Sequence, residues 1–159
     1  MPGSVDSTDL KILSVLLRNA RTPYSQIARM LNLGESTVYM RVRKLIDMGV
    51  LRAFTIDVDL SKLGFVVQAF VDIKAEPKKM GDILMQLKSM PCAVEVYEVS
   101  SEYPITARIV ARDNIDLSEK IDMVARINGV KDVRVRYVLK VISNQVSTEF
   151  LAKLLRTQL

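Results

Sequence analysis

The sequence predicts an α+β protein in which a small helical region comes first and a region of strands and helices follows. Apolar residues recur at helical spacing up to about residue 48 and at a spacing of two from residue 52 onwards. The charge divides at the same place: residues 1–52 carry eight Lys and Arg against four Asp and Glu, and residues 53–159 carry fifteen against fourteen. A small basic part joined to a nearly neutral body favours a module that binds a polyanion.

The first 51 residues predict three short helices. Asp6-Ser7-Thr8-Asp9 supplies capping oxygens for the first. The second is expected to begin near Thr22-Pro23, with Thr22 as the cap and proline at the first helical position. Asn32-Leu33-Gly34 interrupts the pattern as a turn, and the third helix runs from Glu35 or Ser36 to Met48, where Gly49 provides a left-handed end. Three short helices with a tight turn before the last predict a helix-turn-helix domain over residues 1–51.

The remaining residues predict a linker and a second domain. Arg52–Asp59 alternates like a strand and Leu60–Gly64 is a link, so residues 52–64 are interpreted as a hinge strand and linker. Strands and helices are then predicted at 65–74, 78–89, 93–99, 104–112, 115–128 and 130–142. Their order, βαββαβ, is the ferredoxin-like arrangement over residues 65–142. Residues 143–159 predict a short amphipathic helical tail.

The predicted sheet has one nearly all-apolar face and one mixed face. The two helices of a ferredoxin-like unit cover only one side, so the mixed face meets water or another chain. Apolar residues among complementary charges favour an interface between copies of this chain, and an ordinary solvated face is the alternative. The mixed face consists of Gln68, Phe70, Asp72, Thr106, Arg108, Val110, Arg112, Arg134, Arg136 and Val138.

The third helix carries the residues that we expect to contact double-stranded DNA. Arginine can fork onto guanine O6 and N7, which suits Arg43; hydroxyls can bond base edges or phosphates, and Tyr or Met can touch thymine methyl groups. Arg41 and Lys44 are better placed for phosphates. A solvated, charge-rich helix face is the alternative. The predicted DNA-contacting residues are Ser36, Thr37, Tyr39, Met40, Arg41, Arg43 and Lys44.

The composition removes several kinds of chemistry. The chain has no histidine and a single cysteine, Cys92, so the commonest general base is missing and neither a His/Cys zinc site nor an internal disulfide can be built. No Walker-type loop or glycine-rich dinucleotide motif is present. We therefore expect no metal, no cofactor and no enzymatic activity. Glu95, Glu98 and Glu102, which are close in sequence, keep an enzyme or a small-molecule-binding protein as an alternative.

The expected location is the cytoplasm, without membrane contact. No apolar run reaches the roughly 18 residues of a membrane span, and the N-terminus lacks the basic and apolar stretches of a secretion signal. A single cysteine also fits a reducing compartment.

Two stretches resemble the Lrp/AsnC family of transcription regulators: Val5-Asp6-Ser7-Thr8-Asp9-Leu10-Lys11-Ile12-Leu13, and Ser36-Thr37-Val38-Tyr39-Met40-Arg41-Val42-Arg43-Lys44-Leu45 followed by Gly49-Val50-Leu51. The similarity spans about residues 5–142. It implies a winged helix-turn-helix, a hinge strand and a ferredoxin-like effector and assembly domain, the RAM domain. It also implies homodimers that often associate into octamers, with amino acids as common effectors.

One turn departs from the family pattern. In the family, the turn between the second and third RAM strands usually carries a glycine and, three residues later, an aspartate, and it frames an effector pocket between dimers. Here Ser101 stands at the glycine position and Pro104, which has neither a carboxylate nor a backbone N–H, at the aspartate position. The candidate effector-binding residues are Ser100, Ser101, Glu102, Tyr103, Pro104, Arg134 and Arg136.

The expected function is therefore that of an oligomeric, sequence-specific DNA-binding transcription regulator, with an amino acid or a related small molecule as its modulator. The alternative with the same fold is an architectural DNA-binding protein that needs no effector.

Overall fold

The computed structural model describes residues 4–142, and the predicted tail at 143–159 lies outside the described residues. The described chain forms two compact units: an N-terminal unit that includes the residues up to Asp57 together with Ile142, and a C-terminal unit that spans Val58–Val141. Each unit has a hydrophobic core of its own. No helix in residues 4–142 combines the length and the apolar character needed to cross a membrane.

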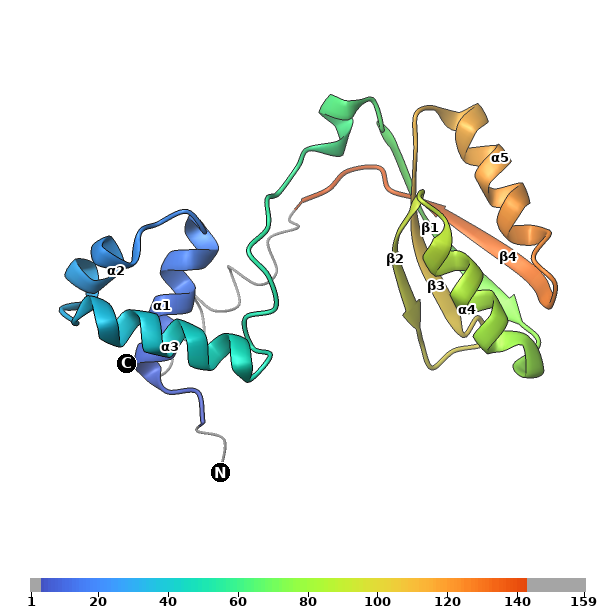
Figure 1. The fold of residues 1–159 in the computed structure, drawn as a ribbon. Helices are drawn as coiled ribbons and strands as arrows, with labels where there is room; N and C mark the ends of the chain where they lie inside the picture. Colours follow the sequence, from blue (N-terminus) through green and yellow to red (C-terminus); the bar gives the residue numbers. More distant parts are fainter. Residues whose placement is uncertain (1–3, 143–159) are drawn as a thin grey trace. The chain divides into compact units, whose positions relative to one another are not determined.

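The N-terminal unit consists of three helices, α1 (Ser7–Arg18), α2 (Tyr24–Leu31) and α3 (Glu35–Asp47) (Figure 1). A capping box starts α1, because the Asp6 side chain accepts from the Asp9 N–H at 2.9 Å and the Asp9 side chain accepts from the Asp6 N–H at 3.1 Å. The predicted Thr22 cap of α2 is wrong. Its hydroxyl instead donates to the Asn19 carbonyl oxygen, while Pro23 occupies the cap position without a side-chain hydrogen bond.

The tight turn and the core of this unit agree with the sequence pattern. Asn32 ends α2 in the left-handed region, with φ of 54°, which asparagine tolerates better than most residues. Gly49 follows α3 with φ of 69°. The apolar side of α3 is fully packed, as its helical spacing predicts: Val38, Val42 and Leu45 are all buried.

The predicted strand over 52–59 is wrong for the single chain. These residues pair with no other segment of residues 4–142, and Ile56 is 80% exposed. Alternation alone makes a strand only where a neighbouring strand accepts its hydrogen bonds, and this stretch has none. A short 3-10 helix (Leu60–Leu63) follows and ends at Gly64, whose φ is 90°.

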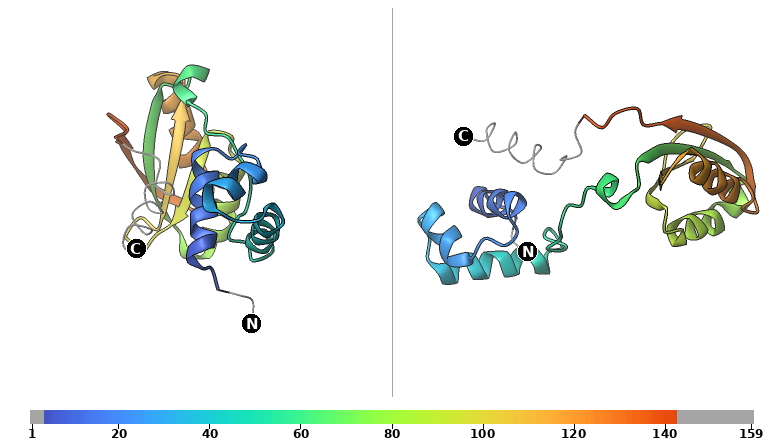
Figure 2. Two further views of the ribbon diagram at one scale, coloured as in Figure 1. Left: turned by 90° about the vertical axis from the view of Figure 1, so that its left-hand side faces the viewer. Right: turned by 90° about the horizontal axis from the view of Figure 1, so that it is seen from above.

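The C-terminal unit has the predicted βαββαβ order: β1 (Val67–Ala75), α4 (Met80–Ser89), β2 (Ala93–Glu98), β3 (Ile105–Ala111), α5 (Asn114–Ala125) and β4 (Val130–Tyr137). The sheet is antiparallel, with strand order β2-β3-β1-β4. Both helices lie on one face (Figure 2), where Ile83, Leu87, Leu117 and Val124 pack on the apolar side of the strands. The opposite face is not covered by any described element of this unit.

The last strand is shorter than predicted. It ends at Tyr137 rather than at residue 142, and Leu139 is 97% exposed. The ladder ends there because its partner strand β1 begins at Val67: Tyr137 is opposite Ala69, and one further hydrogen bond joins the Val138 N–H to the Gln68 carbonyl oxygen. Only Val67 of β1 lies beyond that point, so residues 140–142 have no residue of β1 opposite them.

Candidate nucleic-acid interface

One face of α3 remains exposed after the helix packs on its core. The exposed side chains of α3 include five of the seven predicted DNA-contacting residues: Ser36, Thr37, Tyr39, Met40 and Arg43. Met40 is 63% exposed although it is apolar, and nothing in the described chain covers it. The Tyr39 ring is half exposed and contacts Tyr24 of α2 edge-on, with ring centroids 6.3 Å apart. This face therefore offers hydroxyls, an arginine and two large apolar groups to a partner.

Arg43 is the cation of α3 with the longest and most exposed ion pair. Its Nε lies 3.7 Å from the carboxylate of Asp47, one helical turn away, and both side chains are about two-thirds exposed. An exposed pair of this length contributes little to stability, so the guanidinium can leave it at little cost. Arg43 can therefore reach for a base edge without disturbing the fold.

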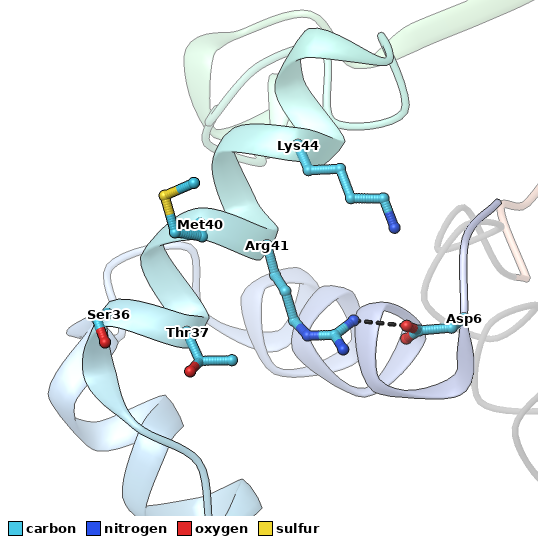
Figure 3. A pocket seen from close by; sticks show the side chains of 6 residues that line it. All are labelled: Asp6, Ser36, Thr37, Met40, Arg41 and Lys44. Carbon is cyan, nitrogen blue, oxygen red and sulfur yellow. Dashed lines mark hydrogen bonds and ion pairs between the residues drawn. The ribbon is translucent and has the colours of Figure 1, made fainter. Parts of the chain in front are cut away.

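Arg41 and Lys44, the two predicted phosphate contacts, are placed differently. Both reach toward the start of α1, as Figure 3 shows for Arg41 and Asp6. Arg41 Nη1 donates to Asp6 and to Asp9, each at 2.7 Å, and Lys44 Nζ donates to Asp9 at 2.9 Å. The structure thus holds these two cations in ion pairs, and their contact with DNA remains a prediction.

Asp9 is the only polar or charged residue in the described chain that is classed as buried, and its side chain is fully buried. Burial by itself raises the pKa of the Asp9 carboxyl. Hydrogen bonds from Lys44, Arg41 and the backbone of Asp6 lower the pKa by more than burial raises it, so the pKa of Asp9 lies below the ordinary value. Hydrogen bonds to Asp6 and Asp9 correspondingly raise the pKa of Arg41. The carboxylate is thus held in its charged form inside the unit.

The turn between β2 and β3 contains the candidate effector residues, and local hydrogen bonds fix it. The Val99 N–H donates to the Pro104 carbonyl oxygen at 2.8 Å. The Ser101 hydroxyl donates to the Tyr103 carbonyl oxygen at 2.7 Å and accepts from the Tyr103 N–H at 3.0 Å. Serine at this position therefore closes the turn on itself.

Tyr103 and Glu102 tie this turn to the neighbouring strands. The Arg134 guanidinium lies 4.4 Å from the centroid of the Tyr103 ring, and the Tyr103 hydroxyl donates to Asp132 at 2.5 Å, which raises the pKa of the phenol. Glu102 forms an ion pair with Lys74 at 2.7 Å, and that hydrogen bond lowers the pKa of Glu102.

Sequence reasoning missed Lys74 and Asp132. Both continue the period-two alternation of the mixed sheet face, and they are opposite each other in the β1–β4 register. That alternation was the signal that could have found them.

The structure separates Arg136 from this group. Its guanidinium forks onto the Asp72 carboxylate at 2.8 and 2.9 Å, and Asp72 also accepts from the Thr106 hydroxyl at 2.8 Å. The hydrogen bond from Arg136 lowers the pKa of Asp72. One of the two arginines among the candidate effector-binding residues is therefore already bound to a carboxylate of its own chain.

The alternative acid–base chemistry finds little support in the geometry. Glu95 forms an ion pair with Arg108 at 2.6 Å, whereas Glu102 pairs with Lys74. Among residues 4–142, no group of three His, Cys, Asp or Glu is arranged to hold a metal ion.

The two units correspond to two known domain families. A family model of winged helix-turn-helix DNA-binding domains matches residues 5–52, and a model of the Lrp/AsnC ligand binding domain matches residues 68–147. The HTH-type transcriptional regulator FL11 of Pyrococcus furiosus is 33% identical over 89% of this chain and 93% of its own length. The HTH-type transcriptional regulator LysM of Sulfurisphaera tokodaii is 35% identical over 87% of this chain and 98% of its own.

Solved structures of two transcription regulators have a similar fold. Escherichia coli AsnC has a TM-score of 0.84 at 26% identity, covering 89% of this chain and 97% of that one. A transcriptional regulator of Neisseria meningitidis, solved as a complex with L-Met, has the same fold with a TM-score of 0.84 at 23% identity, covering 89% of this chain and 94% of that one. Fold and relatives together define a DNA-binding transcription regulator that carries a ligand-binding domain. The chain belongs to the Lrp/AsnC family.

Proposed function

We propose that this regulator recognises a specific operator by placing α3 in the major groove of DNA. The observation that carries the proposal is the exposed face of α3, which follows a tight turn from α2 and bears Arg43 between hydroxyl and apolar side chains. In this arrangement Arg43, Ser36, Thr37, Tyr39 and Met40 face the base edges, and Arg41 and Lys44 lie toward the phosphates.

Genome-wide occupancy of the protein, followed by footprinting of the occupied sites, tests this proposal. We expect a short recurrent sequence with two-fold symmetry, protected on one face of the duplex. Occupancy without any shared sequence would favour the architectural alternative. The absence of DNA binding would favour the small-molecule-binding alternative.

We further propose that the working molecule is at least a homodimer formed through the uncovered sheet face. Phe70 and Val138 are half-buried in the single chain and lie on the face opposite α4 and α5. Around them, ion pairs such as Arg136 with Asp72 and Arg108 with Glu95 already neutralise most of the charge. A face with apolar centres and paired charges can be buried at a lower desolvation cost than one with free charges. Association of such dimers into octamers is the further state that the family suggests.

The third proposal concerns the effector. An amino acid or a related small molecule is the ligand class, supported by the ligand-binding domain match, and the turn at Ser100–Pro104 is the candidate border of its site. Of the two candidate arginines, Arg134 is the better partner for the carboxylate of an amino acid, since it stacks on Tyr103, whereas Arg136 is bound to Asp72.

The second candidate is a regulator without an effector. The observation that favours it is the state of the turn, in which Glu102 is already paired and Pro104 supplies no carboxylate for a ligand ammonium group. Calorimetric titration of the assembled protein with each of the twenty amino acids separates the two candidates. Saturable binding that Arg134→Ala abolishes supports the effector; no heat with any of them supports the second candidate.

A role in binding rather than catalysis completes the proposal, since the relatives are named as transcriptional regulators and two of the three glutamates, Glu95 and Glu102, are held in separate ion pairs. We propose the cytoplasm as the place where it acts.

A further inference from the structure

Two acidic residues at the start of α1 contact two basic residues of α3, and we call these four side chains the acid clamp: Asp6, Asp9, Arg41 and Lys44. Arg41 Nη1 lies 2.7 Å from both carboxylates, and Lys44 Nζ lies 2.9 Å from Asp9. Lys44 also donates to the carbonyl oxygen of Ser4 at 3.0 Å. The clamp contains as many negative as positive charges.

The acid clamp lies at the edge of the proposed DNA surface. Asp6, Arg41 and Lys44 line one open hollow of about 540 Å³ together with Ser36, Thr37 and Met40 (Figure 3). Two cations therefore border the surface on which the polyanion would lie, but two carboxylates offset their charge.

The buried carboxylate of Asp9 keeps Arg41 and Lys44 in place. The Asp9 side chain is fully buried, and a buried carboxylate that loses its partners is costly, so Arg41 and Lys44 cannot both leave it for phosphates. Arg43 differs, because its partner Asp47 is exposed and 3.7 Å away. The helix thus carries two cations in short ion pairs with a buried carboxylate and one cation in a long, exposed pair.

We propose that Asp6 and Asp9 act as positioning residues that limit the ionic part of DNA binding: they fix α3 on α1 and offset the charge of Arg41 and Lys44. The inference rests on the proposed function of α3. Phosphate contacts are the same for every sequence, so weakening them lowers binding to unrelated DNA and leaves base contacts to decide between sites. The acid clamp thereby increases the preference for the operator over unrelated DNA.

The substitution Asp6→Asn tests the proposal. Asparagine caps helices as well as aspartate does, so α1 keeps its start, while Arg41 and Lys44 are left facing one carboxylate. We expect several-fold tighter binding to an unrelated duplex, a smaller ratio of operator to unrelated affinity, and a salt dependence steeper by about 0.9 in log K against log [salt], the value for one added phosphate contact. Affinities are measured with the full chain over a series of salt concentrations.

Two controls separate the acid clamp from general charge and from stability. Asp122→Asn, on α5 of the other unit, makes the same change in net charge and should leave the slope unchanged. In an Arg41→Ala background, Lys44 and Asp9 balance each other, so Asp6→Asn should have no further effect beyond the small one of the charge itself. A merely stabilising role of Asp6 would lower the melting temperature without steepening the salt dependence.

The outcomes are distinguishable. The proposal about the acid clamp is overturned if the salt dependence of Asp6→Asn equals that of the parent, or if its tighter binding to unrelated DNA persists in the Arg41→Ala background. The proposed function still stands in that case if Arg43→Ala weakens operator binding. If duplex binding is indifferent to Arg43→Ala as well, the proposed role of α3 fails and the inference fails with it.

Discussion

Single residues on α3 differ in how freely they can serve a partner. Arg43 has only an exposed carboxylate at 3.7 Å, whereas Arg41 contacts two carboxylates at 2.7 Å. Two arginines two positions apart in one helix thus have different surroundings, because one points along the exposed face and the other toward the start of α1.

The first prediction concerns Arg43. Arg43→Ala should weaken binding to the operator by about 1–3 kcal/mol, as expected when a base-reading arginine is lost, and should relax the sequence preference at one position of each half-site. Fluorescence anisotropy with the operator and with operators altered at single positions measures both effects. Asp47→Ala, which removes the exposed partner of Arg43, is the matched control and should leave the preference intact. Equal losses on every duplex would mean that Arg43 contacts only phosphates.

The second prediction concerns Asp9 and pH. Because the pKa of Asp9 lies below its ordinary value in the folded chain, its ion pairs stabilise the N-terminal unit above the ordinary pKa, and this contribution is lost as the pH falls through the lower, folded value. The melting temperature of Asp9→Asn should therefore lie below that of the parent at neutral pH, and the gap should narrow below about pH 4. Thermal unfolding across a pH series measures the gap. A gap that stays constant down to the acid limit would show that the charge of Asp9 is not what stabilises the unit.

At the scale of the element, local signals located the helices well. Spacing, caps and turn residues are properties of a few neighbouring positions, and they predicted α1, α3 and the buried side of α3 from Val38 to Leu45. These local signals failed where the secondary structure depends on pairing with a segment far away in the sequence. Residues 52–59 have the alternation of a strand but pair with no other segment of residues 4–142, and β4 stops at Tyr137, close to the point where its partner β1 begins at Val67.

The candidate sites divide in the same way. A helical wheel is sufficient to select the exposed face of α3, so Met40 and Arg43 could be predicted from sequence. The ion pairs of Arg41 with Asp6 and Asp9 join residues 35 and 32 positions apart, and only the packing of α1 against α3 brings them together. Likewise, the pairing of Glu102 with Lys74 depends on how the turn folds back over the sheet.

The third prediction concerns the connection between α5 and β4. Gly129 has φ of 98°, and a Cβ there would lie 2.5 Å from the Cβ of Lys79, at the start of α4. Gly129→Ala should therefore destabilise the C-terminal unit by about 1–3 kcal/mol from backbone strain and by about as much again from the clash.

Gly64 is the matched control for this prediction. It has φ of 90° but open space around its Cβ position, so Gly64→Ala should show the strain alone. Urea unfolding of both variants gives the difference. If both variants lose the same free energy of unfolding, Lys79 moves away from the new Cβ at no cost.

At the scale of the whole molecule, the uncovered sheet face sets the fourth prediction. Val138→Glu places a charge among Phe70 and the paired charges of that face, and should shift the sedimenting species toward the monomer and weaken operator binding. Ile115→Glu makes the same chemical change on α5, where the side chain is 74% exposed, and should leave the assembly unchanged. A parent protein that sediments as a monomer would end the idea of a dimer through this face.

The strand order has a consequence for how the chain is made. The described core of the N-terminal unit lies between Ile12 and Leu51, so its helices can fold while the rest is still being synthesised. The C-terminal unit must wait, because β1 lies inside the sheet and one of its neighbours is β4, whose first paired residue is Val130. Until then one edge of β1 lacks its hydrogen-bond partners, and such an edge can pair with another chain and so favours aggregation. Ribosome-stalled chains that end before β4 should accordingly contain a protease-resistant helical unit and a protease-sensitive remainder.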